Sequence, residues 1–258
     1  MPPQMLAHTD GPVGWMTFDN QARRNAVSAE MWAAIPGIIA NFEADPAIRI
    51  IALTGAGDRA FVSGADISQF AEQRANPAQT ADYDRVSAAA TQAIKLATKP
   101  TVAIIRGYCI GGGLGVAATC DLRWATAGSK FGVPAGRLGL GYAHAGVKTL
   151  MDIVGPATTK EIFYTAKHFT AAEALAMGFV TRVQPEESFD AWIAAELATI
   201  AQNAPLTLAA LKLTVRDLLD GSDLARADAA VEACFASADY AEGRTAFMEK
   251  RPPVFQGR

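Results

Sequence analysis

The sequence predicts an α/β protein in which strands and helices alternate before a helical C-terminal region. Short apolar runs rich in β-branched residues are separated by longer segments that are compatible with helices. Strand, helix and strand in that order favour a parallel pair of strands joined by a crossover. Beyond Pro156 the pattern turns to helices, and the last three helical patterns have no strand between them.

The first segments predict two strands on either side of a helix. Residues 12–19 alternate apolar and polar side chains and end in an Asp-Asn pair, which is typical of a strand leading into a turn. Ser28 precedes apolar residues at helical spacing, so a helix capped by Ser28 is expected. Residues 48–54 form a short β-branched run closed by a Gly-Ala-Gly turn, which predicts a buried strand.

The alternation continues through the middle of the chain. Residues 71–97 are compatible with a long helix, which a proline ends before a buried strand at residues 101–105. The glycine triplet Gly111-Gly112-Gly113 then precedes a small, apolar segment at residues 114–120, which predicts a closely packed helix. Residues 122–126 are predicted to form another short strand.

The last third is predicted to be a helical layer. Thr170 and Glu173 have the spacing of a capping box, and Gly178 lies where a glycine would end that helix. Three further helical patterns follow, at residues 189–202, 205–219 and 222–238.

Composition and charge exclude several classes of function. The 50% hydrophobic and 19% charged residues are ordinary for a globular enzyme. A net charge of −3 with scattered Lys and Arg argues against nucleic-acid binding. Residues 1–10 lack the segments of a secretory leader and no apolar run could span a bilayer, so we expect a cytoplasmic protein without a membrane partner.

The cysteines and histidines do not predict a metal site. The three cysteines have no C-x-x-C spacing and the three histidines form no pair at ligand spacing. Ser63 and Cys109 have no histidine partner at a recognisable spacing, so packing and turn roles are expected for both. His168 is expected at the surface.

Two glycine-containing turns are candidates for binding a negatively charged group. At Ser63-Gly64 the chain leaves an apolar run, and the turn could point the following backbone N–H groups outward, although an ordinary strand-to-helix turn explains this pattern alone. The glycine triplet opens a predicted helix, where free N–H groups can face a bound group.

Other glycine-rich nucleotide sites are disfavoured. Residues 113–118 fit the G-x-G-x-x-A pattern of dinucleotide-binding proteins, which also requires an acidic residue roughly 20 positions later. No Asp or Glu lies between Leu122 and Met151, so an NAD-dependent oxidoreductase is discounted. No G-K-[ST] follows a glycine cluster, which excludes a P-loop.

Several motifs resemble the crotonase, or enoyl-CoA hydratase/isomerase, superfamily, and they follow the family's order over nearly the whole chain. They are Arg24-Asn25-Ala26, Ser63-Gly64-Ala65-Asp66-Ile67, Gly111-Gly112-Gly113 with Asp121, Phe131-Gly132-Val133-Pro134 with Gly139, Thr170-Ala171-Ala172-Glu173-Ala174 with Met177-Gly178, and Phe247-Met248-Glu249-Lys250-Arg251.

The resemblance implies an α/β fold with a crotonase-like ββα spiral core and a C-terminal helical trimerisation region. We expect the core to span residues 1–200 and the trimerisation region residues 201–258, in a trimer or a dimer of trimers. The implied substrate is an acyl-CoA thioester. No separate cofactor is expected, because CoA is part of the substrate.

The resemblance also implies where the substrate binds. The backbone N–H groups of Ala65 and Gly112 would hold the thioester carbonyl and stabilise an enolate. The other implied substrate-binding residues are Arg24, Ala26, Ser63, Gly64, Asp66, Ile67, Tyr108, Gly111 and Ala135, with Phe247 and Lys250 reaching CoA in a trimer.

The chain departs from the family where hydratases carry two glutamates. Those positions are Gly115 and Ala135, and neither residue can activate water or protonate a carbon. Tyr142 and His144 lie on a glycine-rich loop that the resemblance places at the acyl pocket, and either could donate a proton. Alternatively, Tyr142 could only cover the pocket wall, and His144 could cap a helix or face solvent. Arg137 could pair with a substrate carboxylate or with a neighbouring side chain.

These substitutions leave the reaction open. Decarboxylation or isomerisation fits a site that stabilises an enolate and supplies a proton, with Tyr142 or His144 as the donor. The alternatives are hydration by a different acid and base, and a CoA-thioester binding protein without catalysis.

Overall fold

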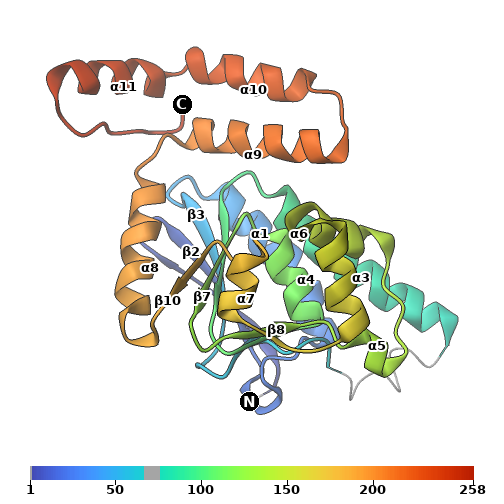
Figure 1. Cartoon of the computed structure of the whole chain (residues 1–258). Coiled ribbons are helices and arrows are strands. Elements are labelled where there is room, and N and C mark those ends of the chain that lie inside the picture. The colour runs from blue at the N-terminus through green and yellow to red at the C-terminus, as the bar shows by residue number, and fades with distance from the viewer. Residues whose placement is uncertain (1, 67–75) are drawn as a thin grey trace.

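The computed structural model describes residues 2–66 and 76–258 (Figure 1). Its strands are β1 (Gln4–Asp10), β2 (Val13–Asp19), β3 (Ile50–Gly55), β4 (Ala60–Val62), β5 (Thr101–Ile105), β6 (Tyr108–Ile110), β7 (Leu122–Thr126), β8 (Lys130–Gly132), β9 (Phe169–Thr170) and β10 (Arg182–Gln184). Its helices are η1 (Gln21–Arg23), α1 (Ala29–Ala44), α3 (Pro77–Leu96), α4 (Gly112–Thr119), α5 (Ala135–Leu138), α6 (His144–Thr165), α7 (Ala171–Ala176), α8 (Glu186–Ala201), α9 (Pro205–Asp220), α10 (Ala225–Phe235) and α11 (Ala238–Glu249).

The core repeats a unit of two strands and a helix. The first strands of the three middle units, β3, β5 and β7, lie in a six-stranded sheet ordered β1-β2-β3-β5-β7-β10, and their second strands, β4, β6 and β8, lie in a four-stranded sheet ordered β4-β6-β8-β9. β3, β4 and α3 form one such unit, and β5, β6 and α4 form the next. Neighbouring strands of successive units are parallel, as crossover connections require. The predicted α/β class is confirmed.

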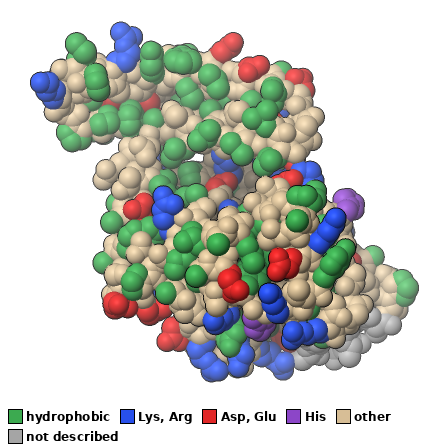
Figure 2. All heavy atoms as spheres, viewed as in Figure 1, with side chains coloured by type: hydrophobic (Ala, Val, Ile, Leu, Met, Phe, Trp, Pro, Cys, Tyr) green, Lys and Arg blue, Asp and Glu red, His purple; other side chains and the backbone are tan. Residues whose placement is uncertain are grey.

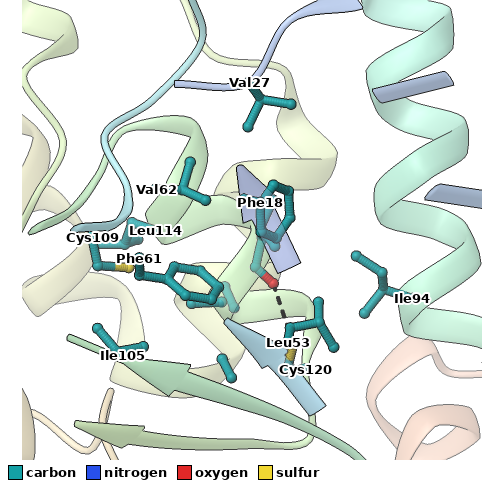
Figure 3. Packing of buried hydrophobic residues seen from close by; sticks show 14 of the residues in the cluster. Phe18, Val27, Leu53, Phe61, Val62, Ile94, Ile105, Cys109, Leu114 and Cys120 are labelled. Carbon is teal, nitrogen blue, oxygen red and sulfur yellow. Dashed lines mark hydrogen bonds between the residues drawn. The ribbon is translucent and has the colours of Figure 1, made fainter. Parts of the chain in front are cut away.

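Both faces of the six-stranded sheet are covered. Along β3 and β5, alternate side chains point to opposite faces, so Ile51 and Ala103 enter the main core while Ile50 and Val102 enter a second cluster. Phe189, Ile193 and Leu197 of α8 cover that second cluster. The main core lies between the two sheets and the helices, where side chains such as Phe18, Leu53 and Phe61 meet (Figure 3).

The last three helices form an arm beside the spiral core (Figure 1). α9 and α10 pack on each other and α11 follows. The chain then turns back, because the buried Asp239 carboxylate accepts hydrogen bonds from the amides of Gln256 (2.7 Å) and Gly257 (2.8 Å). The Arg49 guanidinium donates to the Phe255 carbonyl at 3.2 Å, which ties the tail to the core.

Most of the predicted elements are confirmed. The strands expected at residues 12–19, 48–54, 101–105 and 122–126 correspond to β2, β3, β5 and β7. Ser28 caps α1 by accepting from the Met31 amide, and Thr170 and Glu173 form a capping box before α7. The helix expected over residues 71–97 is confirmed from Pro77 onward, and its earlier part lies outside the described residues.

Four expectations about the elements are wrong or incomplete. The region after Pro156 is not purely helical, because β9 and β10 each complete a sheet edge. The strands β6 and β8 were not expected, since three residues are too few to show a period. The pattern at residues 222–238 ends early at Phe235, because Ser237 caps a further helix, α11, that was not predicted. The N-terminal residues form β1, which pairs antiparallel with β2.

Across residues 2–66 and 76–258, no helix combines the length and apolarity needed to cross a membrane. The expected division at residues 200 and 201 falls at the end of α8, and it stays a prediction.

The close packing of α4 on β4 generates a stability prediction. A Cβ atom at Gly113 would lie 2.1 Å from the Val62 carbonyl oxygen, whereas one at Gly115 would meet no atom of the described residues within 4 Å. We expect Gly113→Ala to lower the free energy of unfolding by about 2 kcal/mol or more. Gly115→Ala should leave the free energy of unfolding unchanged or raise it by about 0.5 kcal/mol. Thermal unfolding of both variants measures the difference, and equal melting temperatures would contradict this packing.

Candidate active site

The glycine triplet connects β6 to α4. Gly111 has φ 55° and ψ −115°, a backbone conformation that an L side chain rarely allows. Its amide donates to the Gly132 carbonyl at 2.8 Å, which fixes the reversal of the chain. α4 begins at the next residue, so the Gly112 amide is one of the donors that a first helical turn cannot satisfy.

Residues 63–66 lie against this helix start. Gly64 has φ 117°, and a Cβ atom at Gly112 would lie 3.5 Å from the Ala65 nitrogen. Within the part of the chain that the structure describes, no hydrogen bond uses the amide of Ala65 or of Gly112. Two neighbouring unpaired N–H groups beside the start of a helix suit an oxygen on which negative charge develops.

A turn from the N-terminal part of the chain holds residues 63–66 in place. The Val27 amide donates to the Gly64 carbonyl at 2.9 Å, and the Asp66 amide donates to the Val27 carbonyl at 3.0 Å. The turn depends on buried Asn25, which has φ 57° and donates to the Ala60 carbonyl at 2.7 Å. The position of the Ala65 amide is therefore fixed by the hydrogen bonds that its two neighbours make with Val27.

Charged and aromatic groups border this turn. The Arg24 guanidinium lies 5.2 Å from the centre of the Tyr108 ring. Asp66 is only 7% exposed, and its carboxylate pairs with Arg23 at 3.3 Å. Because Arg24 is exposed and forms no ion pair among the described residues, it can bind an anionic group such as a phosphate.

Tyr142 reaches over the glycine turn. Its hydroxyl lies 3.9 Å from the place that a Cβ atom on Gly111 would occupy. The ring packs edge-on against Phe163, with ring centres 4.9 Å apart. Although 39% of the residue is exposed, desolvation raises the pKa of the Tyr142 hydroxyl above its usual value. The phenol therefore holds its proton at neutral pH and can act as a donor.

His144 and Arg137 are both exposed. His144 is the first residue of α6 rather than part of a loop, and no described residue contacts its side chain through a hydrogen bond or an ion pair. Arg137 of α5 is likewise without a carboxylate partner among the described residues, so the expected pairing with a neighbour is not found.

Gly115 and Ala135, where the resemblance led us to expect glutamates in a hydratase, differ in their surroundings. Gly115 is partly exposed on α4, and a Cβ atom there would meet no described atom within 4 Å. Ala135 begins α5, is 4% exposed and belongs to the main core. The first position therefore has room for a side chain, and the second is filled by packing.

The other predicted binding residues divide into three groups. Ala26 is buried beside the Asn25 turn, and the Ser63 hydroxyl donates to the Arg23 carbonyl at 3.0 Å. Ile67 lies outside the described residues. Phe247 and Lys250 lie at the end of α11, in the arm and away from α4 (Figure 1), so this chain does not bring them to its own glycine turns.

Two of the three cysteines are in environments unsuited to nucleophilic catalysis. Cys109 and Cys120 are both buried. Burial raises the pKa of the Cys120 thiol to about 12, and it raises the pKa of the Cys109 thiol well above its usual value. The packing role expected for Cys109 agrees with this environment, and His168 is exposed as expected.

Three residues at the site were not singled out from the sequence. Asn25 fixes the turn, Arg23 pairs with Asp66, and Phe163 supports the Tyr142 ring. Phe163 and Arg23 act through tertiary contacts that no local pattern reveals. Asn25 lies within the quoted Arg24-Asn25-Ala26 motif, but its role became visible only in the structure, where Arg24 and Asn25 both have left-handed backbones.

Comparisons with solved structures define the class of the fold. A crystal structure of an enoyl-CoA hydratase/carnithine racemase from Magnetospirillum magneticum superposes with a TM-score of 0.94 at 33% identity, covering 98% of this chain and 96% of the other. A putative enoyl-CoA hydratase/isomerase family protein from Hyphomonas neptunium gives 0.94 at 35% identity, covering 98% of both chains. The fold is therefore crotonase-like, as the sequence motifs predicted.

Sequence comparisons identify the family. The sequence model of the enoyl-CoA hydratase/isomerase family matches residues 8–258. The short-chain-enoyl-CoA hydratase of Clostridium acetobutylicum is 31% identical, covering 96% of this chain and 95% of the relative. The crotonyl-CoA hydratase of Syntrophomonas wolfei subsp. wolfei is 34% identical, covering 90% and 89%. The chain belongs to the enoyl-CoA hydratase/isomerase family of the crotonase superfamily.

The environment of Tyr142 generates a pH prediction. Desolvation raises its pKa in the folded state, so folded protein holds this proton more tightly than unfolded protein. In an absorbance titration, the tyrosine ionisation that is present in the wild type and absent from Tyr142→Phe should have its midpoint above about pH 10. Stability should also fall faster in the wild type than in the variant as pH rises above that value. A midpoint at or below the usual value would contradict the desolvated position.

Proposed function

We propose that this protein is an enzyme that acts on acyl-CoA thioesters and stabilises a thioester enolate with the Ala65 and Gly112 amides. One observation carries the proposal: two unpaired backbone donors lie together beside a protonated Tyr142, while Gly115 and Ala135 supply no carboxylate. Oxyanion donors of this kind contribute roughly 3–4 kcal/mol each to transition-state stabilisation.

Decarboxylation or isomerisation fits these groups better than hydration. In a decarboxylation the breaking carbon–carbon bond leaves its electron pair on the enolate as CO₂ departs, so no base is needed. The α-carbon then takes a proton, for which Tyr142 is the proposed donor and His144 the alternative. An isomerisation needs a single group that takes a proton from one carbon and returns it to another, whereas hydration needs one group to activate water and another to protonate carbon. Among the described residues, the carboxylate of Asp66 lies beside the turn and is paired with Arg23.

CoA is proposed to lie along the surface where Arg24, which follows η1, meets Tyr108 of β6. Arg24 offers an exposed guanidinium to a phosphate, stacked beside the Tyr108 ring. Phe247 and Lys250 would come from another subunit, because they lie on the arm of their own chain. Exposed apolar side chains on the arm, such as Phe235 (62%) and Met248 (79%), support a trimer or a dimer of trimers that covers them.

Two other functions are tested alongside this proposal. Hydration by a different acid and base is favoured by the names of the relatives, two of which are called hydratases. A CoA-thioester binding protein without catalysis would keep the two amides and need no proton donor.

The donor role of Tyr142 predicts a specific loss of proton transfer. Turnover of a malonyl-type CoA thioester, in which loss of CO₂ generates the enolate, should fall by about 10²-fold or more in Tyr142→Phe. Tyr164→Phe is the matched control, since Tyr164 is 79% exposed on the same helix, α6, that follows Tyr142. A loss in His144→Ala instead would move the donor role to that residue, and binding without turnover of any malonyl-type or acyl-CoA thioester in the wild type would indicate a binding protein.

The missing glutamates predict weak hydration of crotonyl-CoA. Because two acid–base groups are absent, we expect turnover at least about 10²-fold slower than that of the Clostridium acetobutylicum relative under the same conditions. Loss of the absorbance of the conjugated thioester measures the reaction. Comparable rates in the two proteins would overturn the non-hydratase proposal and favour hydration by another acid and base.

A further inference from the structure

A cavity of about 460 Å³ lies between the arm and the spiral core. Figure 2 shows the hollow that separates the C-terminal helices from the rest of the molecule. Leu208, Leu211 and Leu219 of α9 form its outer wall, and Ile153 of α6 and Ile200 of α8 face them from the core. A cavity of this size with apolar walls can enclose part of a small-molecule ligand.

The charged side chains around the cavity are already engaged. Each of the following lining residues has an opposite charge nearby: Lys212 with Asp121 (2.8 Å), Lys95 with Asp220 (3.1 Å), Arg216 with Asp217 (3.5 Å) and Asp152 with Lys148 (2.6 Å). The Arg123 guanidinium donates instead to backbone carbonyls, including that of Cys120 at 2.6 Å. The cavity therefore suits an uncharged, apolar group better than an ionic one.

An accessible face of α4 leads from the glycine turn to this cavity. Among residues 111–120, only Gly111, Gly112, Gly115 and Thr119 keep partial solvent exposure, and the others are buried. The spacing of three and four residues places the last three on one side of the helix. Thr119 also lines the cavity, whereas Gly112 and Gly115 do not, so the partly exposed face spans the distance between the glycine turn and the cavity, a rise of about 10 Å along the helix.

We infer that the acyl chain of the substrate runs along this face of α4 and ends in the cavity beneath α9. This inference rests on the proposed function, because Gly112 must hold the thioester carbonyl for the chain to start there. It makes the substrate a medium- or long-chain acyl-CoA whose tail is uncharged. A crotonyl group would leave the cavity empty.

The absence of a side chain at Gly115 also affects the path of the acyl chain. Gly115 lies midway between Gly112 and Thr119 on the accessible face, and a Cβ atom there would project into space that no described atom fills within 4 Å. A glutamate at this position would extend across the path of the chain. The glycine at position 115, which supplies no proton donor, therefore also leaves the route to the cavity open.

Calorimetric binding of saturated thioesters tests the inference without depending on the reaction. Butyryl-, octanoyl- and dodecanoyl-CoA should bind with rising affinity, by roughly fourfold for each methylene that enters the cavity. Thr119→Phe should remove the gain for dodecanoyl-CoA and leave butyryl-CoA binding unchanged. Thr199→Phe is the matched control, because Thr199 is exposed on α8 and bonds its own helix as Thr119 does.

The outcomes separate this inference from the proposed function. Equal affinity for butyryl- and dodecanoyl-CoA would overturn the proposed acyl path and leave the proposed function intact. Equal affinity is also the result expected if a second copy of the chain fills the cavity. Failure to bind any of the three thioesters would overturn the proposed function as well. If Thr119→Phe does not fold, the chain-length series on the wild type still decides the inference.

Discussion

α4 lies so close to β4 that a methyl group at Gly113 would overlap the Val62 carbonyl oxygen. This approach brings the Gly112 amide beside the Ala65 amide, although more than forty residues separate them in the chain. Glycine is required at position 113 because no side chain fits, and at 111 because the backbone has φ 55°. The candidate site exists because a helix and a strand meet without side chains between them.

The chemistry proposed here follows from what surrounds those two amides. Tyr142 is partly desolvated and supported by Phe163, so it is the one neutral donor placed over the glycine turn in the described structure. Position 115 is open and position 135 is packed with a methyl group, so neither offers a carboxylate. For this reason we propose a decarboxylation, in which the enolate forms without a protein base, or an isomerisation, in which one group moves the proton.

Polar contacts attach the C-terminal arm to the spiral core. The ion pair between Lys212 and Asp121 joins α9 to the residue that follows α4 and its C-cap, while Asp239 and Arg49 return the C-terminal tail to the core. These contacts hold an apolar cavity between arm and core at the far end of the helix that carries Gly112. The site and the cavity therefore share one rigid element.

The sequence by itself determined the α/β class, the long strands, the capped helices and the family, because apolar period, glycine position and motif order are local properties. It also indicated Ala65, Gly112 and Tyr142, through resemblance. It could not reveal β6, β8 or β10, whose three residues gain their meaning only from neighbouring strands. Only the tertiary structure decided that His144 begins a helix, that Phe163 supports Tyr142 and that Phe247 lies in the arm, because these depend on contacts between segments distant in the chain.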